Sequence, residues 1–286
     1  MGQATARLFD AMAEEYDVLE PWYQHLYAAI HRILLDTLLP PRAAEQPRAL
    51  DAGCGTGFQA ALLERLGYET HGVDIAPRLL AVARRRLPAS TLVLASVEAL
   101  PYRDADFEAV ACCGSTLSFV DDPRAACEEL ARVLKPGGRL LLEVEHRWSL
   151  DLVWALASAL GRDVLGYGVS PREAWRHLTR QPRDGCTIPY PGYGSLRLFT
   201  RRELHAMLTR AGLRPVRWWG IHSITNLIPS TVLHRDKLSS PTAALYACLR
   251  SIDRRLSTSL FARGANSLVV LAEKSRPTRR SHGLLQ

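Results

Sequence analysis

The sequence predicts an α/β fold in which a mainly parallel sheet is covered by helices on both faces. The first observation is that short apolar segments alternate with amphipathic helical segments from Arg48 to His146, with turn residues between them. The second is a glycine-rich turn between the first of these strands and the first helix. The 286 residues are 47% hydrophobic and 23% charged, which is typical of a globular chain with one large domain or a domain and a subdomain.

Helices are expected before the alternating region. Apolar residues recur at helical spacing over residues 6–19 and again over 22–39, and Pro40 and Pro41 end the second pattern. We therefore assign residues 1–47 to an N-terminal helical region.

The alternating region predicts five strands and three helices. The strands are expected over residues 48–53, 69–75, 91–96, 106–115 and 138–146. The helices are expected over residues 58–67, 76–87 and 122–138. Right-handed crossovers place the carboxyl ends of such strands at one edge of the sheet, where ligands bind.

The alternation stops after His146, where a first insertion is expected over residues 147–198. We expect it to hold an apolar helix and then the Pro/Gly/Tyr-rich loop TIPYPGYGS. A helix follows over 200–213, opened by Thr200 with Glu203 three residues later.

Two further strands complete the predicted sheet, over residues 213–223 and 267–275. Between them, residues 221–265 form a second insertion with one more helix. We assign 48–146 and 199–274 to the core domain and 275–286 to a basic, disordered tail.

The distribution of charge and the cysteine content indicate which partners the protein binds and whether it holds a metal ion. Residues 1–145 carry 14 basic and 21 acidic side chains, and residues 146–286 carry 22 and 8, which leaves the second part strongly basic. Such a surface attracts an acidic substrate, an anionic membrane surface or nucleic acid. The six cysteines show no metal-ligand spacing, so we expect buried thiols and no metal site. Without an apolar leader or a membrane-spanning run, the chain is expected to be cytoplasmic.

The glycine-rich turn reads Asp-Ala-Gly-Cys-Gly-Thr-Gly over residues 51–57. Glycines at such a turn let the backbone bend sharply and approach a ligand. The spacing is GxGxG, whereas the dinucleotide fingerprint is GxGxxG. Asp74 ends the second strand, where a carboxylate can accept both hydroxyls of a ribose. Together these residues predict a nucleoside-containing ligand.

Five segments resemble the class I S-adenosylmethionine-dependent methyltransferases, specifically the small-molecule, ubiquinone/menaquinone-type and methyltransferase type 11-like group. They cover residues 9–145 in the expected order: FDAMAEEYD, LDAGCGTG, GVDIA, SVEALPYRDADFEAV and RVLKPGGRLLLEV. The resemblance implies a Rossmann-like sheet of seven strands, the last one antiparallel, and S-adenosyl-L-methionine as the cofactor.

The resemblance also implies roles for individual residues. Asp51 would orient the turn and the amino group of the cofactor, Asp74 would hold the ribose, and Ile75 would pack on the adenine. Ser96 stands where many relatives carry an aspartate, so the Val97 backbone or Glu98 is left to contact the adenine amino group. The remaining expected cofactor residues are the turn residues Gly53, Cys54, Gly55 and Gly57, the closing residue Tyr16, and Cys113 and Gly114 facing the methyl group.

The acceptor site is expected to lie between the N-terminal helices and the two insertions. Their aromatic residues favour an apolar or flat acceptor: Trp148, Trp154, Trp175, Tyr167, Tyr190, Tyr193, Phe199, Trp218 and Trp219. A general base is needed only where the acceptor must lose a proton. The candidates are His146, which ends a strand at the ligand edge, Tyr190, Tyr193 and His222. Arg147, Arg197 and Arg235 could bind an acidic acceptor.

The sequence thus predicts an enzyme that methylates a small apolar, aromatic or acidic metabolite, with oxygen favoured over carbon or nitrogen. The alternatives are an RNA methyltransferase and a catalytically silent protein that binds the cofactor. We expect a small-molecule acceptor, peripheral contact with an anionic membrane, no specific nucleic acid, and a monomer or homodimer.

Overall fold

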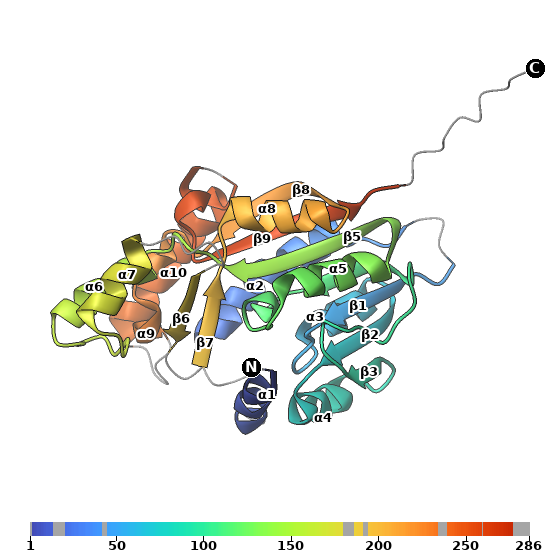
Figure 1. Ribbon diagram of the computed structural model, residues 1–286, viewed down its shortest axis with the longest axis horizontal. Coiled ribbons are helices and arrows are strands. Elements are labelled where there is room, and N and C mark those ends of the chain that lie inside the picture. Colours follow the sequence, from blue (N-terminus) through green and yellow to red (C-terminus); the bar gives the residue numbers. More distant parts are fainter. Residues whose placement is uncertain are drawn as a thin grey trace, which may run out of the picture.

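The computed structural model describes residues 2–13, 21–41, 45–179, 186–190, 194–233, 239–258 and 260–276. A seven-stranded sheet has the order β3-β2-β1-β4-β5-β9-β8 (Figure 1). Its strands are β1 (Arg48–Ala52), β2 (Glu69–Asp74), β3 (Thr91–Leu94), β4 (Phe107–Cys112), β5 (Leu134–Glu145), β8 (Leu213–Ile221) and β9 (Ser267–Lys274). β9 is antiparallel to β5 and β8, and the other neighbouring pairs are parallel. The predicted Rossmann-like sheet with an antiparallel last strand is confirmed.

Helices cover both faces of this sheet. α2 (Pro21–Thr37) and α3 (Phe58–Arg65) pack on one face, and α5 (Pro123–Val133) and α8 (Arg201–Arg210) pack on the other. α4 (Pro77–Arg86) lies along β2 and β3, and α1 (Gly2–Ala11) packs against α4. Because the sheet is buried on both faces, its central strands are continuous apolar runs.

Local signals account for where the helices begin. Asp122 caps α5 by accepting hydrogen bonds from the backbone N–H groups of Arg124 and Ala125, at 2.9 and 3.2 Å. Thr200 caps α8 by accepting from the N–H of Glu203 at 3.1 Å, as the sequence predicts. Each cap satisfies N–H groups that have no partner inside the helix.

The segment 147–198 differs from its prediction. It holds two helices, α6 (Asp151–Leu160) and α7 (Pro171–Thr179), and an antiparallel hairpin of β6 (Cys186–Tyr190) and β7 (Gly194–Leu198). The expected loop TIPYPGYGS is therefore mostly strand. Leu196 and Leu198 are buried while Ser195 is exposed, the alternation of a strand with one buried face.

The hairpin and helices lie beyond the carboxyl end of β5 (Figure 1). The N–H of Phe199 donates to the carbonyl of Glu145, and the N–H of Arg147 donates to the carbonyl of Phe199, both at 2.9 Å. These bonds join the end of the hairpin to the end of β5. We call residues 147–198 the cap.

The second insertion is also helical. It contains η2 (Thr225–Leu227), α9 (Ser230–Leu233), α10 (Ser240–Leu256) and η3 (Leu260–Gly264). Among the residues described, no helix is both long and apolar enough to cross a bilayer. Most of the predicted basic tail, residues 277–286, lies outside the described residues.

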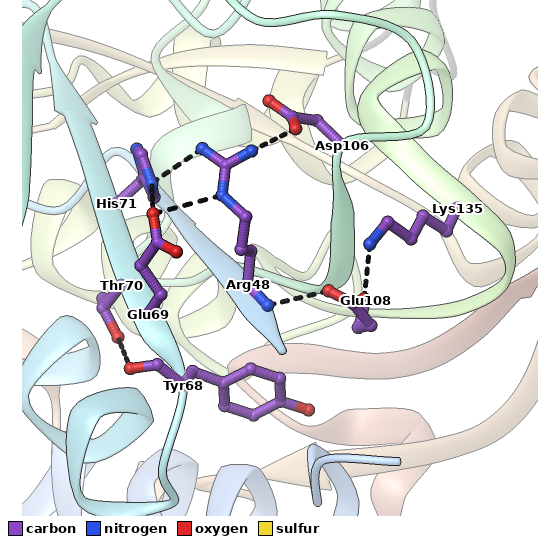
Figure 2. A network of polar contacts seen from close by, with 8 residues as sticks. All are labelled: Arg48, Tyr68, Glu69, Thr70, His71, Asp106, Glu108 and Lys135. Carbon is purple, nitrogen blue, oxygen red and sulfur yellow. Dashed lines mark hydrogen bonds and ion pairs between the residues drawn. The ribbon is translucent and has the colours of Figure 1, made fainter. Parts of the chain in front are cut away.

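A polar network occupies the opposite edge of the sheet, at the amino ends of β1, β2 and β4 (Figure 2). The guanidinium of Arg48 pairs with Asp106 and with Glu69, whose Oε1 lies 3.3 Å from Arg48 Nε. His71 Nε2 lies 2.8 Å from Arg48 Nη2. The backbone N–H of Arg48 donates to Glu108, which also pairs with Lys135 (Figure 2). The network ties three strands together far from the ligand edge.

Candidate active site

A cavity of about 400 Å³ opens at the ligand edge. It lies where β1, β2, β3 and β4 end, and α1 contributes Thr5, Ala6 and Phe9 to its wall. The remaining lining residues come from the glycine-rich turn and the strand ends: Gly53, Gly55, Asp74, Ile75, Leu79, Ser96, Val97, Glu98, Gly114, Thr116, Phe119, Val120 and Asp121. This volume falls in the usual range of small-molecule sites.

The glycine-rich turn forms one wall with its backbone. Gly53 and Gly55 have φ angles of +82° and +52°, which residues with a Cβ rarely adopt. A Cβ on Gly53 would lie 2.3 Å from the hydroxyl oxygen of Thr116, while Gly55 faces open space. The turn is thus held tightly at Gly53 and leaves the Gly55 backbone accessible to a ligand.

Two carboxyl groups hold this turn. The Oδ2 of Asp74 accepts from the N–H of Gly55, and its Oδ1 accepts from the N–H of Ala76, both at 2.9 Å. The Oδ2 of Asp51 accepts from the N–H of Ala60 at 2.8 Å, while its buried Oδ1 has no hydrogen-bond partner among the described residues. Burial raises the pKa of Asp74 and raises that of Asp51 to about 7.

Ser96 and Glu98 face the same cavity and contact each other. The hydroxyl of Ser96 donates to Oε2 of Glu98 at 3.1 Å, and the N–H of Glu98 donates back to Ser96 at 3.2 Å. The other oxygen of Glu98 accepts from the N–H of Asp122, at the start of α5, at 2.6 Å. This pair places a hydroxyl and a carboxyl group in the lining of the cavity.

Four expected cofactor residues do not line the cavity: Asp51, Cys54, Gly57 and Cys113. Cys54 and Cys113 are buried, and burial raises the pKa of both thiols. The Cys113 thiol points toward the carbonyl of Leu141, 3.8 Å away. Gly57 instead approaches α4, where an added Cβ would lie 2.6 Å from the Leu87 side chain. Tyr16 lies outside the described residues.

The candidate bases are not gathered in this cavity. His146 is buried, its Nδ1 lies 3.1 Å from the carbonyl of Ala265, and burial lowers its pKa to about 4. His222 faces a separate cavity between α2 and α10, and its Nδ1 lies 3.0 Å from the hydroxyl of Thr225. Tyr190 belongs to β6, but its side chain, like all of Tyr193, lies outside the described part of the structure.

Two of the three arginines predicted to bind an acidic acceptor contact other side chains of the protein, and the third lies outside the described residues. Arg147 donates to the Cys186 thiol at 2.7 Å, and Arg197 pairs with Glu203 at 2.8 Å. Arg235 lies outside the described residues. Within the described ranges, no group of three His, Cys, Asp or Glu side chains could hold a metal ion.

A smaller cavity of about 40 Å³ lies beneath the cap, next to the end of β5. Sequence reasoning missed its acidic residue Glu145, although Glu143 and Glu145 alternate at a strand end on the ligand edge. That position could have singled out Glu145. Of the aromatic residues expected to form the acceptor site, Tyr167 lines this cavity, whereas Trp148 and Trp175 are exposed.

Comparison with known proteins agrees with this geometry. Residues 50–142 match the family described as a methyltransferase domain. The chain is 35% identical over 194 residues to a ubiquinone biosynthesis O-methyltransferase of Xanthomonas oryzae pv. oryzae, covering 62% of this chain and 81% of that protein. It is 35% identical over 152 residues to a malonyl-[acyl-carrier protein] O-methyltransferase of Serratia marcescens, covering 52% of this chain and 55% of that one.

A solved structure shares the fold. The 1,6-didemethyltoxoflavin-N1-methyltransferase of Burkholderia thailandensis, with bound S-adenosylhomocysteine, aligns with a TM-score of 0.53 at 18% identity, covering 96% of this chain and 89% of that one. The chain therefore belongs to the class I S-adenosylmethionine-dependent methyltransferases, enzymes that transfer a methyl group from that cofactor, here to a small-molecule acceptor.

Proposed function

We propose that the chain binds S-adenosylmethionine in the 400 Å³ cavity and methylates an oxygen atom of an apolar, aromatic or acidic small molecule held under the cap. The observation that carries this proposal is one cavity that combines the Gly55 backbone, the Asp74 carboxylate and the apolar residues Ile75 and Val97. These groups match the methionine, ribose and adenine parts of the cofactor.

The residues present fit that cofactor. The Asp74 carboxyl accepts from the N–H groups of Gly55, Ala76 and Ile75, and its remaining lone-pair capacity is available to a ribose hydroxyl. The unpartnered Oδ1 of Asp51 could accept from the cofactor's amino group. The Ser96–Glu98 pair offers a carboxylate to the adenine amino group. Closure by Tyr16 and roles for Cys54, Gly57, Cys113 and Gly114 remain predictions.

The protein's part in the reaction is positioning and exclusion of water. When bound, the cofactor supplies a methyl group already activated by a positively charged sulfur. α1 contributes Phe9 to the cavity wall, and the cap is joined to the end of β5. An enclosed site holds the acceptor oxygen in line with the methyl group and keeps water from competing.

Calorimetric titration with S-adenosylhomocysteine tests the cofactor site. We expect Asp74→Asn to weaken binding about 10- to 100-fold, the value of one or two hydrogen bonds to a charged group. Asp36→Asn, an exposed carboxyl on α2, is the matched control and should bind like the wild type. Equal affinity in the two variants would contradict the assignment.

We also propose that the cap makes peripheral contact with an anionic membrane. Val153 and Leu160, seven residues apart on α6, are 49% and 69% exposed, and Val164 beyond them is 72% exposed. On α7, exposed Trp175 lies between the exposed Arg172 and Arg176. An apolar surface beside arginines suits a bilayer with acidic headgroups.

Co-sedimentation with vesicles tests this contact. We expect binding to vesicles with about 30% acidic lipid, weaker binding to neutral vesicles, and loss of binding in Leu160→Glu. Val216→Glu changes an exposed apolar residue of β8 and is the matched control. Binding that is unaffected by Leu160→Glu would exclude the cap as the contact.

A further inference from the structure

The 40 Å³ cavity beneath the cap is apolar with an acidic end. Leu152, Ala155, Ile188, Leu196 and Leu198 supply apolar walls. No lysine or arginine lines it within the described part of the chain. Its ionisable lining residues are Glu145, Asp151, Tyr167 and His177. Its volume holds a few water-sized groups, enough for the reacting end of a small molecule.

This cavity adjoins the cofactor cavity. Gly114 and Thr116 line the cofactor cavity, and the residue between them, Ser115, donates from its hydroxyl to Oε1 of Glu145 at 2.9 Å. Phe119 lines the cofactor cavity and packs on the apolar cluster of the cap that includes Leu198. Glu145 is therefore one hydrogen bond away from the wall of the cofactor site.

Glu143 and Glu145 have different surroundings although both contact Ser115. Glu143 is fully buried and accepts from the N–H of Ser115 at 2.6 Å, so it holds the turn. Glu145 lines the cap cavity, and its Oε2 accepts from the amide of Asn266 at 3.2 Å. Each Glu145 oxygen has a lone pair left for a ligand.

The groups that face Glu145 make its surroundings acidic. Burial raises its pKa well above the usual value, and the nearby Glu143 and Asp151 raise it further. Asp151 is itself occupied, because it accepts from the Tyr167 hydroxyl at 2.8 Å and from the N–H of Ser230 at 3.0 Å. Burial lowers the pKa of His177, which favours its neutral form. A carboxylate entering this cavity would meet acidic groups and, among the described lining residues, no partner cation.

We propose that the cap cavity receives the reacting end of the acceptor, that Glu145 accepts its proton, and that the acceptor is an uncharged, apolar molecule with a weakly acidic hydroxyl, such as a phenol. This proposal rests on the proposed function and narrows it, because acidic acceptors are excluded. It also replaces the histidine and tyrosine candidates with a carboxylate.

The step balances as a displacement coupled to proton transfer. The acceptor oxygen forms the new bond to the methyl carbon, and the electron pair of the broken carbon–sulfur bond stays on sulfur. The hydroxyl proton passes to the Glu145 carboxylate, which later returns it to water. A base with a raised pKa is matched to a phenol better than an ordinary carboxylate would be.

Binding to the complex with S-adenosylhomocysteine is the first test. Calorimetry on that complex compares 4-propylphenol, 4-propylanisole and 4-propylbenzoate, which share one apolar body. We expect the phenol to bind at least about tenfold more tightly than the benzoate. Equal or tighter binding of the benzoate, or no binding of any probe, would overturn the proposal. A protein that fails to bind S-adenosylhomocysteine would instead contradict the proposed function.

Methyl transfer to 4-propylphenol is the second test. We expect Glu145→Gln to lower kcat at least about 100-fold without changing affinity for S-adenosylhomocysteine, and Glu145→Asp to recover part of the loss. The wild-type rate should rise with pH as Glu145 loses its proton, and the glutamine variant should lose that rise. Glu128→Gln, an exposed carboxyl on α5, is the control. Unchanged kcat in Glu145→Gln, or no transfer to the bound phenol, would contradict the assignment.

Discussion

Asp51 illustrates how a single buried carboxyl couples cofactor binding to pH. Its Oδ1 has no described partner, and burial raises its pKa to about 7. Below that pH the carboxyl is mostly protonated, and a neutral carboxyl accepts from a cationic amino group less strongly than a carboxylate does. Cofactor binding must then remove a proton, which weakens the affinity as the pH falls.

We therefore predict that the affinity for S-adenosylhomocysteine increases from pH 6 to pH 8, by up to about tenfold per unit below the carboxyl's pKa. Calorimetry at pH 6, 7 and 8 measures this dependence. Asp51→Asn cannot titrate and should bind with nearly the same affinity at all three values. A wild-type affinity that does not change with pH would exclude Asp51 as the acceptor of the amino group.

His146 and Glu145 show what sequence reasoning can and cannot decide at this scale. Both lie at the predicted carboxyl end of β5, and the sequence places both at the ligand edge. Neighbouring strand residues point to opposite faces, but the sequence does not say which face borders the second cavity. Only the position of the cap, which the sequence left unspecified, decides in favour of Glu145.

At the scale of elements, α7 begins with a capping box that the sequence analysis did not use. The N–H of Glu173 donates to the Ser170 hydroxyl at 3.3 Å, and the N–H of Ser170 donates to Oε2 of Glu173 at 3.0 Å. Pro171 follows at the first helical position. These are the signals expected at the start of a helix.

Removing the capping box formed by Ser170 and Glu173 should destabilise α7 and no other helix. We predict that Ser170→Ala costs about 1 kcal/mol locally, which corresponds to about fivefold faster amide exchange across Pro171–Thr179. Hydrogen–deuterium exchange with peptide resolution measures the effect. Ser240→Ala, at the exposed start of α10, should leave α7 exchange unchanged. Equal amide exchange rates of α7 in the wild type and in Ser170→Ala would show that the capping box does not stabilise α7.

The β6–β7 hairpin was missed for a related reason. Pro and Gly residues in TIPYPGYGS indicate turns, yet Pro189 lies within β6, opposite Ser195. A two-stranded hairpin leaves one side of each strand without a ladder, so a proline is tolerated there. The buried Leu196 and Leu198 are the stronger signal, and they lie directly after that segment.

The polar network at the amino ends of β1, β2 and β4 stabilises the sheet without touching the ligand edge (Figure 2). We predict that Arg48→Met lowers the free energy of unfolding by about 1 to 3 kcal/mol, because it leaves partly buried carboxylates without their cation. Urea denaturation measures the change. Affinity for S-adenosylhomocysteine should be unaffected, and a loss of affinity would contradict the separation of the two edges.

At the scale of the whole molecule, buried carboxyl groups and not histidines determine how stability changes with pH above neutrality. Burial lowers the pKa of His31 and His146 to about 4. These histidines are neutral in both states above their usual pKa of 6.5, so they add no pH dependence there. Asp51 and Glu145 have raised pKa values, so the folded state holds their protons longer than the unfolded state. Their contribution to stability therefore falls as the pH rises through those folded-state values.

We predict that the protein without cofactor is less stable at pH 8 than at pH 7, where the unfolded histidines have already lost most of their protons. Urea denaturation at both values measures the difference, and Asp51→Asn should reduce it. Stability that is equal or greater at pH 8 would show that the carboxyls are already ionised at neutral pH in the folded state.

The sequence predicted the architecture better than the chemistry of the acceptor. The apolar strands and the glycine-rich turn depend on local patterns, which is why β1 to β5, β8 and β9 lie close to their predicted positions. Asp74 and Gly55 could be assigned because the turn and the strand end are adjacent in any such fold. The contact between Glu145 and Ser115 joins residues 30 positions apart, and the cap that encloses them follows no periodic pattern.

The position of β9 also affects how the sheet folds during translation. Residues 267–274 pair on one side with β5 and on the other with β8, although both strands precede β9 in the chain. A ribosome releases β1 to β5 well before it releases the strand that covers the edge of β5. The nascent chain therefore carries an open, apolar sheet edge until β9 has been made, and such an edge favours aggregation. A translation stop between β8 and β9 would yield a product in which that edge never closes.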